Sequence, residues 1–333
     1  MKIKPRHLTA GTVASLIAIT ILVIGLTFGP KHITVAQTAT GDPELAGYLA
    51  QHAPKGAHNL AAAVVDSNGA VKFAGLGADE NTEFEIGSVS KTFTAELLRQ
   101  AVERGEVTLD TTVGEILDDA DMSTSDITLK ELATHTSGLP RILGISAFAV
   151  AISMQRKQNP YDGFTTQRIL DEARTATLAD RSTYNYSNFG MALLGHLLAR
   201  RAGTTYAQLA QERIFTPLGM SNTYVMTPET TPANAPRGLD ITGHPTAAWD
   251  DEGYGPAGGI RSTAADMTHF MKHLLAQGLP DYTWVREQDV AWHNGMTGGF
   301  ASMLVIDPRN NNASFVANDS NVAIDELGME LPR

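Results

Sequence analysis

Residues 60–75 read LAAAVVDSNGAVKFAG, and this stretch decides the fold. Its first six residues are apolar and β-prone, and a second β-prone segment at 70–75 follows the pair Asn68-Gly69. An Asn-Gly pair between two such segments is typical of a β-hairpin, because Gly tolerates the positive φ that the tight turn demands. The sequence therefore predicts an antiparallel hairpin early in the globular part of the chain.

The far end of the chain has a similar pattern. Residues 300–306 and 313–317 are β-prone, and Asp307-Pro308 opens a turn rich in Asn between them. The middle of the chain instead carries apolar residues at helical spacing, most clearly at 92–104, 191–201 and 263–277. We therefore expect an α+β fold. Strands from both ends of the chain form one antiparallel sheet flanked by helices, and a mainly helical subdomain is inserted between them.

Composition excludes several classes of function. The 333 residues include no Cys, so disulfides, thiolate zinc sites and cysteine nucleophiles are excluded. No HExxH pair or other metal-spaced cluster occurs, so we expect neither a metal nor a cofactor. The net charge is −11, and beyond the first 41 residues 21 basic side chains face 36 acidic ones. A surface this acidic argues against binding to nucleic acid.

The beginning of the chain has the pattern of an export signal. Lys2, Lys4 and Arg6 precede an uncharged, strongly apolar run at 8–30, which is long enough to span a bilayer as a helix. We interpret residues 1–7 as cytoplasmic, 8–30 as a transmembrane signal anchor, 31–42 as a linker and 43–333 as an extracytoplasmic domain that acts as a monomer. A cleaved signal peptide and a buried core helix remain the alternatives.

The segment Ser88-Val89-Ser90-Lys91 is the one S-x-x-K of the sequence and stands where a helix should begin. Residues three apart share a helix face, so the Lys91 ammonium can lie beside the Ser88 hydroxyl and ease the loss of its proton. The helix N-terminus favours developing negative charge. The alternative is that Ser88 merely caps the helix.

Two further short motifs follow in order. Tyr186-Ser187-Asn188 is the one Y-x-N: Tyr186 could be a general base if a nearby cation lowers its pKa, and Asn188 could orient Lys91 and a substrate amide. His293-Asn294-Gly295 precedes the terminal strands, and Gly295 would let a substrate backbone approach closely. Each motif alone has an ordinary explanation, as a core tyrosine or as a surface histidine in a turn.

Taken together, these motifs resemble the serine β-lactamase and penicillin-binding-protein superfamily, in its class C β-lactamase and D-alanyl-D-alanine carboxypeptidase branch. Three further segments, which are similar to motifs of that branch, lie outside the site. They are LATHTSGLP at 132–140, FTPLGM at 215–220 and AGGIRSTAADM at 257–267. The resemblance covers about residues 43 to 333.

The resemblance implies a role for each matching residue. Ser88 would form an acyl-enzyme, while Lys91 and Tyr186 would share proton transfer, with Tyr186 returning the proton to the leaving group. Asn188 would bind the substrate amide. His293 and Asn294 would form the third wall of the site. The backbone N–H groups of Ser88 and of Met296, which follows Gly295, would form the oxyanion hole. His135 would have a structural role.

One motif departs from the β-lactamase pattern. The family sequence is K-T-G, whereas this chain has His293-Asn294-Gly295, which is similar to carboxypeptidase, D-aminopeptidase and esterase members. A histidine is only partly cationic at neutral pH. Arg286, seven residues earlier on a neighbouring strand, is the candidate for the missing positive charge.

The sequence thus leaves three functions open. The leading one is an acyl-serine hydrolase that acts on D-alanyl peptides, amides or esters. The second is a class C-like β-lactamase, because the Ser-Lys and Tyr-Asn pairs are intact. The third is a penicillin-binding or sensor module without turnover, suggested by the single apolar span and the altered third motif. The choice of substrate depends on loops between about Ile142 and Tyr184.

Overall fold

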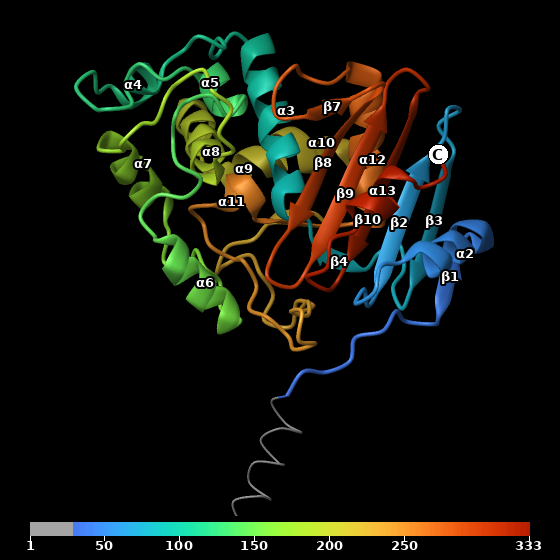
Figure 1. Cartoon of the computed structure of the whole chain (residues 1–333). Coiled ribbons are helices and arrows are strands. Elements are labelled where there is room, and N and C mark those ends of the chain that lie inside the picture. Colours follow the sequence, from blue (N-terminus) through green and yellow to red (C-terminus); the bar gives the residue numbers. More distant parts are fainter. Residues whose placement is uncertain (1–28) are drawn as a thin grey trace, which may run out of the picture.

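The computed structural model describes residues 29–333. Its main sheet has seven antiparallel strands in the order β1-β3-β2-β10-β9-β8-β7. β2 pairs with β10 from Val65↔Ala313 to Leu60↔Asn318, so strands from both ends of the chain lie side by side at its centre (Figure 1). The predicted α+β fold is confirmed. The strands are β1 Ala39–Gly41, β2 Leu60–Val65, β3 Val71–Leu76, β7 Val285–Glu287, β8 Val290–Met296, β9 Ala301–Asp307 and β10 Asn312–Asn318.

The turn between β2 and β3 explains why residues 60–75 form a hairpin. Gly69 has a φ of 79°, a conformation that costs a glycine little. The Asp66 side chain accepts hydrogen bonds from the backbone N–H groups of Asn68 and Ala70, both at 2.9 Å. These bonds give the N–H groups of the turn their hydrogen-bond partners and so fix the pairing of the two strands.

Both faces of the sheet are buried, and alternate residues of β2 reach different cores. Ala61, Ala63 and Val65 pack in the larger core, on the side of α3 (Ser90–Glu103) and α12 (Ala264–Gln277). The residues between them pack in a second core, on the side of α2 (Pro43–His52) and α13 (Asp325–Met329). A strand covered on both faces reads as a continuous apolar run, which is what LAAAVV shows.

The inserted region is built around α8 (Asn188–Ala202), of which residues 189–199 are all buried. Helices α4, α5 and α7 lie around α8 on the side away from the main sheet (Figure 1), and β4, β6 and β5 form a second, three-stranded sheet in the order β4-β6-β5. The other elements of this part of the chain are α4 Val113–Leu117, α5 Leu129–Ala133, α6 Ala147–Gln155, α7 Thr166–Arg174, α9 Tyr206–Ala210, the π-helical segment η2 Gln211–Phe215, α10 Thr216–Leu218, α11 Gly255–Gly258, β4 Glu83–Glu85, β5 Tyr224–Val225 and β6 Ile260–Thr263.

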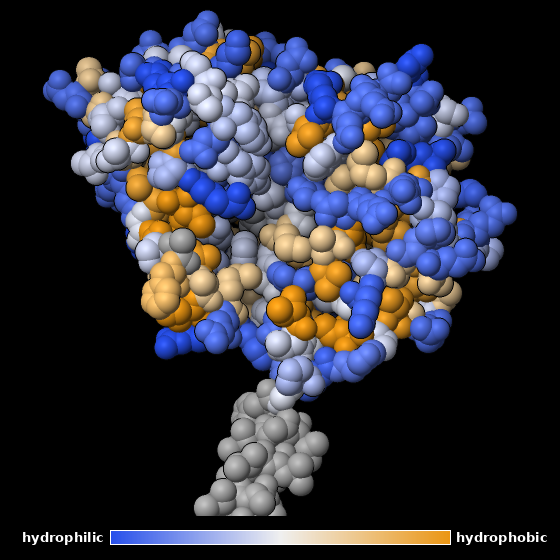
Figure 2. All heavy atoms as spheres, in the orientation of Figure 1, coloured by the Kyte–Doolittle hydropathy of each residue, from blue (hydrophilic) through white to orange (hydrophobic). Residues whose placement is uncertain are grey.

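The surface is mostly polar, with an apolar area over α6. Figure 2 shows apolar side chains gathered at the lower left of the molecule, where Figure 1 places α6. Phe148 of this helix is 75% exposed, whereas Val150 and Met154 line a pocket. α6 is therefore one wall of that pocket and presents another face to solvent.

The start of the domain differs from the predicted boundary at residue 43. Residues 39–41 form β1 and pair with β3, and the Gly77 N–H donates to the Thr38 carbonyl. Part of the predicted 31–42 linker is therefore an edge strand, which three residues without apolar alternation could not reveal. The predicted span at 8–30 lies outside the described residues except for positions 29 and 30. Between residues 29 and 333, no helix has both the length and the apolar character that crossing a membrane requires.

Candidate active site

Ser88 lies in a single 3₁₀ turn (Gly87–Val89) directly before α3. The capping position of α3 is Val89, and no side chain caps this helix end. The Ser88 hydroxyl instead contacts two side chains: its Oγ is 2.9 Å from Lys91 Nζ and accepts a hydrogen bond from the Tyr186 hydroxyl at 2.8 Å. The geometry thus favours a reactive hydroxyl over the simple helix cap.

Lys91 is fully buried beside Ser88. Its Nζ also donates to the Ala257 carbonyl at 2.5 Å, so neither of its two oxygen partners is a carboxylate. Burial, reinforced by the charge of Arg141, holds the pKa of the Lys91 amine well below its usual range. An amine of this kind loses its charge more readily and can accept a proton from the serine.

Tyr186 lies between two cations. Lys91 Nζ and Arg141 Cζ are each 4.9 Å from the centre of its ring, and its hydroxyl points at Ser88. The condition for a general-base role, a pKa lowered by a neighbouring cation, is not met. Burial raises the pKa of the Tyr186 hydroxyl, and the bond to Ser88 and the Arg141 charge oppose this only in part. Tyr186 is therefore a protonated donor in the free protein, because desolvation outweighs the cation.

The loop at 132–140 holds Tyr186 in place. His135, at a φ of 58°, packs its ring 4.7 Å from the Tyr186 ring, and its Nδ1 accepts the Ser187 N–H at 3.2 Å. The Ser187 hydroxyl donates to the Pro140 carbonyl at 2.6 Å. Burial lowers the pKa of His135 to about 3, so this ring is neutral and can accept that bond. These contacts agree with the predicted structural role of His135.

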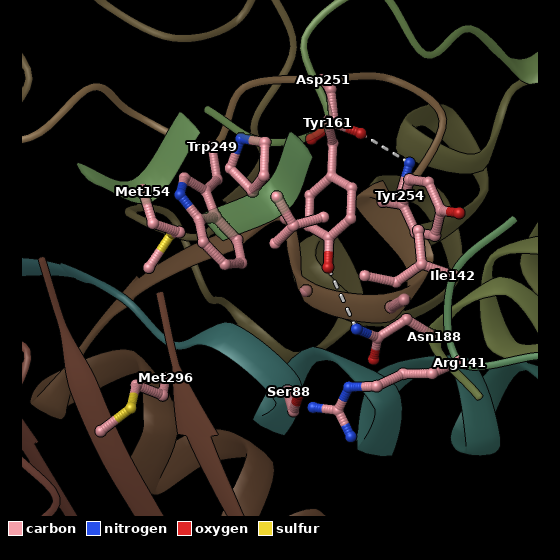
Figure 3. Close-up of a pocket in the computed structure, with 15 residues that line it drawn as sticks. Ser88, Arg141, Ile142, Met154, Tyr161, Asn188, Trp249, Asp251, Tyr254 and Met296 are labelled. Atoms are coloured by element: carbon pink, nitrogen blue, oxygen red, sulfur yellow. Dashed lines mark hydrogen bonds between the residues drawn. The ribbon is translucent and has the colours of Figure 1, made fainter. Parts of the chain in front are cut away.

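Asn188 begins α8 and reaches the same pocket. Its Nδ2 donates to the Tyr161 hydroxyl at 3.1 Å. Its Oδ1 is buried and has no hydrogen-bond partner among the described residues. The predicted contact with Lys91 is absent from the hydrogen bonds within residues 29–333, since the amide turns to Tyr161 instead (Figure 3). The unpartnered Oδ1 is an acceptor that a ligand N–H could satisfy.

The end of β8 lies against the turn that carries Ser88. A methyl group on Gly295 would come within 1.9 Å of the Ile86 carbonyl oxygen, and one on Gly87 within 2.5 Å of the Met296 nitrogen. The Ser302 hydroxyl of β9 also donates to the Ile86 carbonyl at 2.8 Å. Glycine is therefore required for this close approach, which brings the Met296 backbone next to Ser88. The oxyanion hole assigned to these two residues remains a prediction.

The other two residues of the third motif, His293 and Asn294, lie in different environments, one buried and one exposed. His293 is buried, its Nδ1 donates to the Asn294 carbonyl at 2.7 Å, and burial next to Lys91 lowers its pKa to about 4. This imidazole is thus neutral at neutral pH. Asn294 is exposed and its amide donates to Asp325 on α13, so its side chain is engaged outside the pocket.

Arg286 does not bring its charge to the site. β7 is the neighbour of β8, as expected, but the guanidinium donates to the Pro280 carbonyl at 3.0 Å and to Asp281 at 3.3 Å. Strand pairing fixes only the backbone, and the side chain follows its nearest acceptors. The cation found in the pocket is Arg141, which directly follows the LATHTSGLP segment and which sequence reasoning missed.

The pocket in front of Ser88 has a volume of about 190 Å³. Arg141 and Asn188 lie next to Ser88, and aromatic rings form the opposite wall (Figure 3). Tyr161 stacks on Tyr254 at 4.3 Å and meets Trp249 edge-on at 5.3 Å. No motif marks these three aromatic residues in the sequence. Within residues 29–333, no group of three or more His, Asp or Glu side chains could hold a metal ion.

Comparisons with known proteins identify related sequences and structures. The sequence model described as Beta-lactamase matches residues 46–292. A beta-lactamase of Pseudomonas fluorescens is 31% identical over 201 residues, 58% of this chain and 51% of that protein. The D-alanyl-D-alanine-carboxypeptidase/endopeptidase AmpH of Escherichia coli K12 is 29% identical over 238 residues, 66% of this chain and 58% of AmpH. A solved beta-lactamase structure from Sulfitobacter sp. EE-36 has a TM-score of 0.68 at 22% identity, covering 84% of this chain and 91% of that one.

The protein thus has an α+β fold with a site in which the Ser88 hydroxyl contacts Lys91 and Tyr186. Because the family model matches well over half of its length, the chain belongs to the beta-lactamase family. The predicted resemblance is therefore confirmed. The chain spans about half the length of the curated relatives it matches.

Proposed function

We propose that this protein is an acyl-serine hydrolase that acts on D-alanyl peptides, related amides or esters. One observation carries the proposal: Ser88 Oγ is within hydrogen-bond reach of both the Lys91 amine and the Tyr186 hydroxyl, at the edge of a pocket. A serine becomes a useful nucleophile when a base is positioned beside it. The kinship with a D-alanyl-D-alanine-carboxypeptidase supports the choice of substrates.

The site residues fit a two-step acyl transfer. Neutral Lys91 takes the Ser88 proton as Oγ bonds to the substrate carbonyl carbon, whose π electrons move onto the oxygen. When the tetrahedral intermediate collapses, the bond to the leaving group breaks. Tyr186 donates its proton to that group and regains one from the Lys91 ammonium. Water then attacks the acyl-serine by the same route in reverse and releases the acid and free Ser88.

A direct test uses purified domain and a panel of substrates. The panel contains a D-Ala-D-Ala peptide, a p-nitrophenyl ester and nitrocefin. We expect turnover of the peptide or the ester, and its loss in Ser88→Ala without change in the melting temperature. Ser67→Ala, at an exposed position in the β2–β3 turn, is the matched control. Unchanged turnover in Ser88→Ala would refute the proposal.

A class C-like β-lactamase is the second candidate, favoured by the intact Ser88, Lys91 and Tyr186 contacts and by relatives named as beta-lactamases. The neutral His293 argues against it, because the K-T-G lysine of that pattern is cationic. Fast nitrocefin hydrolysis would favour this candidate. A stable penicillin adduct without turnover of any substrate would favour the sensor module.

We propose an extracytoplasmic location, with the domain attached to the membrane through residues 8–30. The support is the uncharged apolar run behind Lys2, Lys4 and Arg6. Mass spectrometry of the mature N-terminus tests the attachment: an intact start supports the anchor, and a start near Gln37 indicates a cleaved signal. We also propose that the protein works as a monomer, since one chain supplies every site residue. Light scattering of the purified protein tests this.

A further inference from the structure

The backbone of Arg141 is anchored at the edge of the pocket, and its side chain is exposed. Its carbonyl accepts the N–H groups of Asn188 at 2.9 Å and Phe189 at 3.2 Å, the first residues of α8. From this anchor the side chain extends beside Ser88 (Figure 3), and its guanidinium lies over the Tyr186 ring. A buried helix end thus fixes where the guanidinium can reach.

This guanidinium has no anionic partner within the described chain. Arg141 is exposed, and other exposed arginines of the described chain, such as Arg156 and Arg237, also form no ion pair; Arg141 differs from them because it lines the pocket beside Ser88. For Arg141, no carboxylate of residues 29–333 lies within the 4.0 Å of an ion pair. The Arg141 guanidinium lies over the face of the Tyr186 ring, with its Cζ 4.9 Å from the ring centre. Figure 3 shows that it extends towards Ser88.

Arg141 is also the one basic side chain among the described residues that line the pocket. The one acidic lining residue, Asp251, is buried, and its carboxyl is occupied by the Tyr254 N–H at 2.7 Å. Figure 3 shows Tyr161 between Asp251 and the Arg141 guanidinium. Neither His293 nor Arg286 brings a positive charge to Ser88. The pocket therefore presents an exposed cation beside the nucleophile, and no carboxylate of residues 29–333 is paired with it.

We propose that Arg141 binds a carboxylate of the substrate, so that the preferred substrates are esters or amides that carry an anionic group near the reacting carbonyl. The proposal rests on the proposed acyl-serine chemistry and specifies its substrates. A guanidinium forms two parallel hydrogen bonds with a carboxylate, which gives both affinity and orientation. The apolar wall opposite, made by Tyr161, Trp249 and Tyr254, would accommodate the uncharged part.

A second role for Arg141 must be separated from this one. Its contact with the Tyr186 ring could position the tyrosine, in which case its loss would slow every substrate equally. A substrate-binding role instead affects charged substrates selectively. The two roles are distinguished by comparing substrates that differ in one charge.

The kinetic test uses mono-p-nitrophenyl glutarate and its methyl ester, which differ only in the terminal carboxylate. Arg141→Gln should lower kcat/KM for the glutarate about 10- to 100-fold, because charge-assisted hydrogen bonds are lost. It should lower the value for the methyl ester by less than about 3-fold. Arg141→Lys should recover part of the loss. Arg286→Gln, the matched control, should change neither value. Equal losses for the two esters in Arg141→Gln would overturn the proposal.

A binding test keeps the inference separate from turnover. Phenylboronic acid and its 3- and 4-carboxy derivatives bond reversibly to an active serine and need no hydrolysis. Calorimetry should show that at least one carboxy derivative binds the unmodified protein about 10-fold more tightly than the parent compound, and that Arg141→Gln abolishes the preference. This result without ester turnover would sink the proposed hydrolysis but keep the anion site. No preference, or no binding of the carboxy derivatives, would overturn the anion site even if neutral esters are hydrolysed.

Discussion

Replacing Asp251 by asparagine should stabilise the protein at neutral pH and leave it nearly unchanged in acid. Asp251 is 6% exposed at the pocket wall, where it accepts the Tyr254 N–H at 2.7 Å and the Asn159 amide at 3.4 Å. Burial raises the pKa of this carboxyl from 3.8 to about 7, against the lowering effect of those bonds. The carboxyl therefore binds its proton more tightly in the folded state than in the unfolded state.

The size and sign of the effect follow from that difference. At about 1.4 kcal/mol for each pKa unit, a rise from 3.8 to about 7 corresponds to about 4 kcal/mol, an upper value because solvent relaxes around a real carboxylate. The advantage of the folded state is complete below pH 3.8 and is lost as the pH rises towards about 7. Asparagine carries no titrating proton and keeps an acceptor for the Tyr254 N–H, so it avoids this loss.

The assay is urea unfolding from about pH 4 to about pH 8, for the wild type, Asp251→Asn and the control Asp162→Asn. Asp162 is exposed on a loop near the same pocket. The free energy of unfolding of Asp251→Asn minus that of the wild type should grow with pH and level off above about pH 7, and Asp162→Asn shows what the same substitution does at an exposed position. A difference for Asp251→Asn that does not change with pH would contradict the assignment of a buried, destabilised carboxylate.

Three more outcomes are expected of the site. Tyr186→Phe should lower kcat about 10²- to 10⁴-fold and cost no more than about 1.5 kcal/mol of stability in urea unfolding, because it removes one hydrogen bond and keeps the ring. The rate of acylation of Ser88 should rise with pH with an apparent pKa well below the 10.5 of a free lysine, because Lys91 must be neutral to accept the proton. A stopped-flow pH profile in which the acylation rate does not rise in this way would exclude Lys91 as the base. Gly295→Ala should lower the free energy of unfolding by about 1 to 3 kcal/mol and remove most of the activity, because its methyl group clashes with the Ile86 carbonyl. The control Gly47→Ala, in α2 with open space around it, should keep the activity and raise the free energy of unfolding by about 0.5 to 1 kcal/mol in thermal unfolding.

Local patterns were enough to predict the frame of this fold. The Asn68-Gly69 turn and its apolar flanks specified a hairpin, and both the hairpin and the terminal strands formed where expected. The S-x-x-K spacing placed Lys91 beside Ser88, because three residues correspond to nearly one turn of helix. Contacts of this kind depend on short stretches of chain, which the sequence displays directly.

The environment of each site residue could not be predicted in the same way. A role for Tyr186 as general base required a neighbouring cation to lower its pKa, but burial by segments far apart in the chain raises the pKa of its hydroxyl. Asn294 and Arg286 lie on the expected strands, yet their side chains bond to Asp325 and Asp281 rather than facing the pocket. Arg141 follows a recognised segment but belongs to no motif, and its place depends on how that loop packs against α8.

The central claim is that Ser88 attacks a substrate carbonyl and becomes acylated. Intact-protein mass spectrometry after brief exposure to a penicillin and to a p-nitrophenyl ester, followed by peptide mapping, measures this directly. We predict one added acyl group per chain, located on Ser88, which is absent in Ser88→Ala and slow to form in Lys91→Met. An unmodified protein under conditions of measured turnover, or an acyl group on a different residue, would contradict the account.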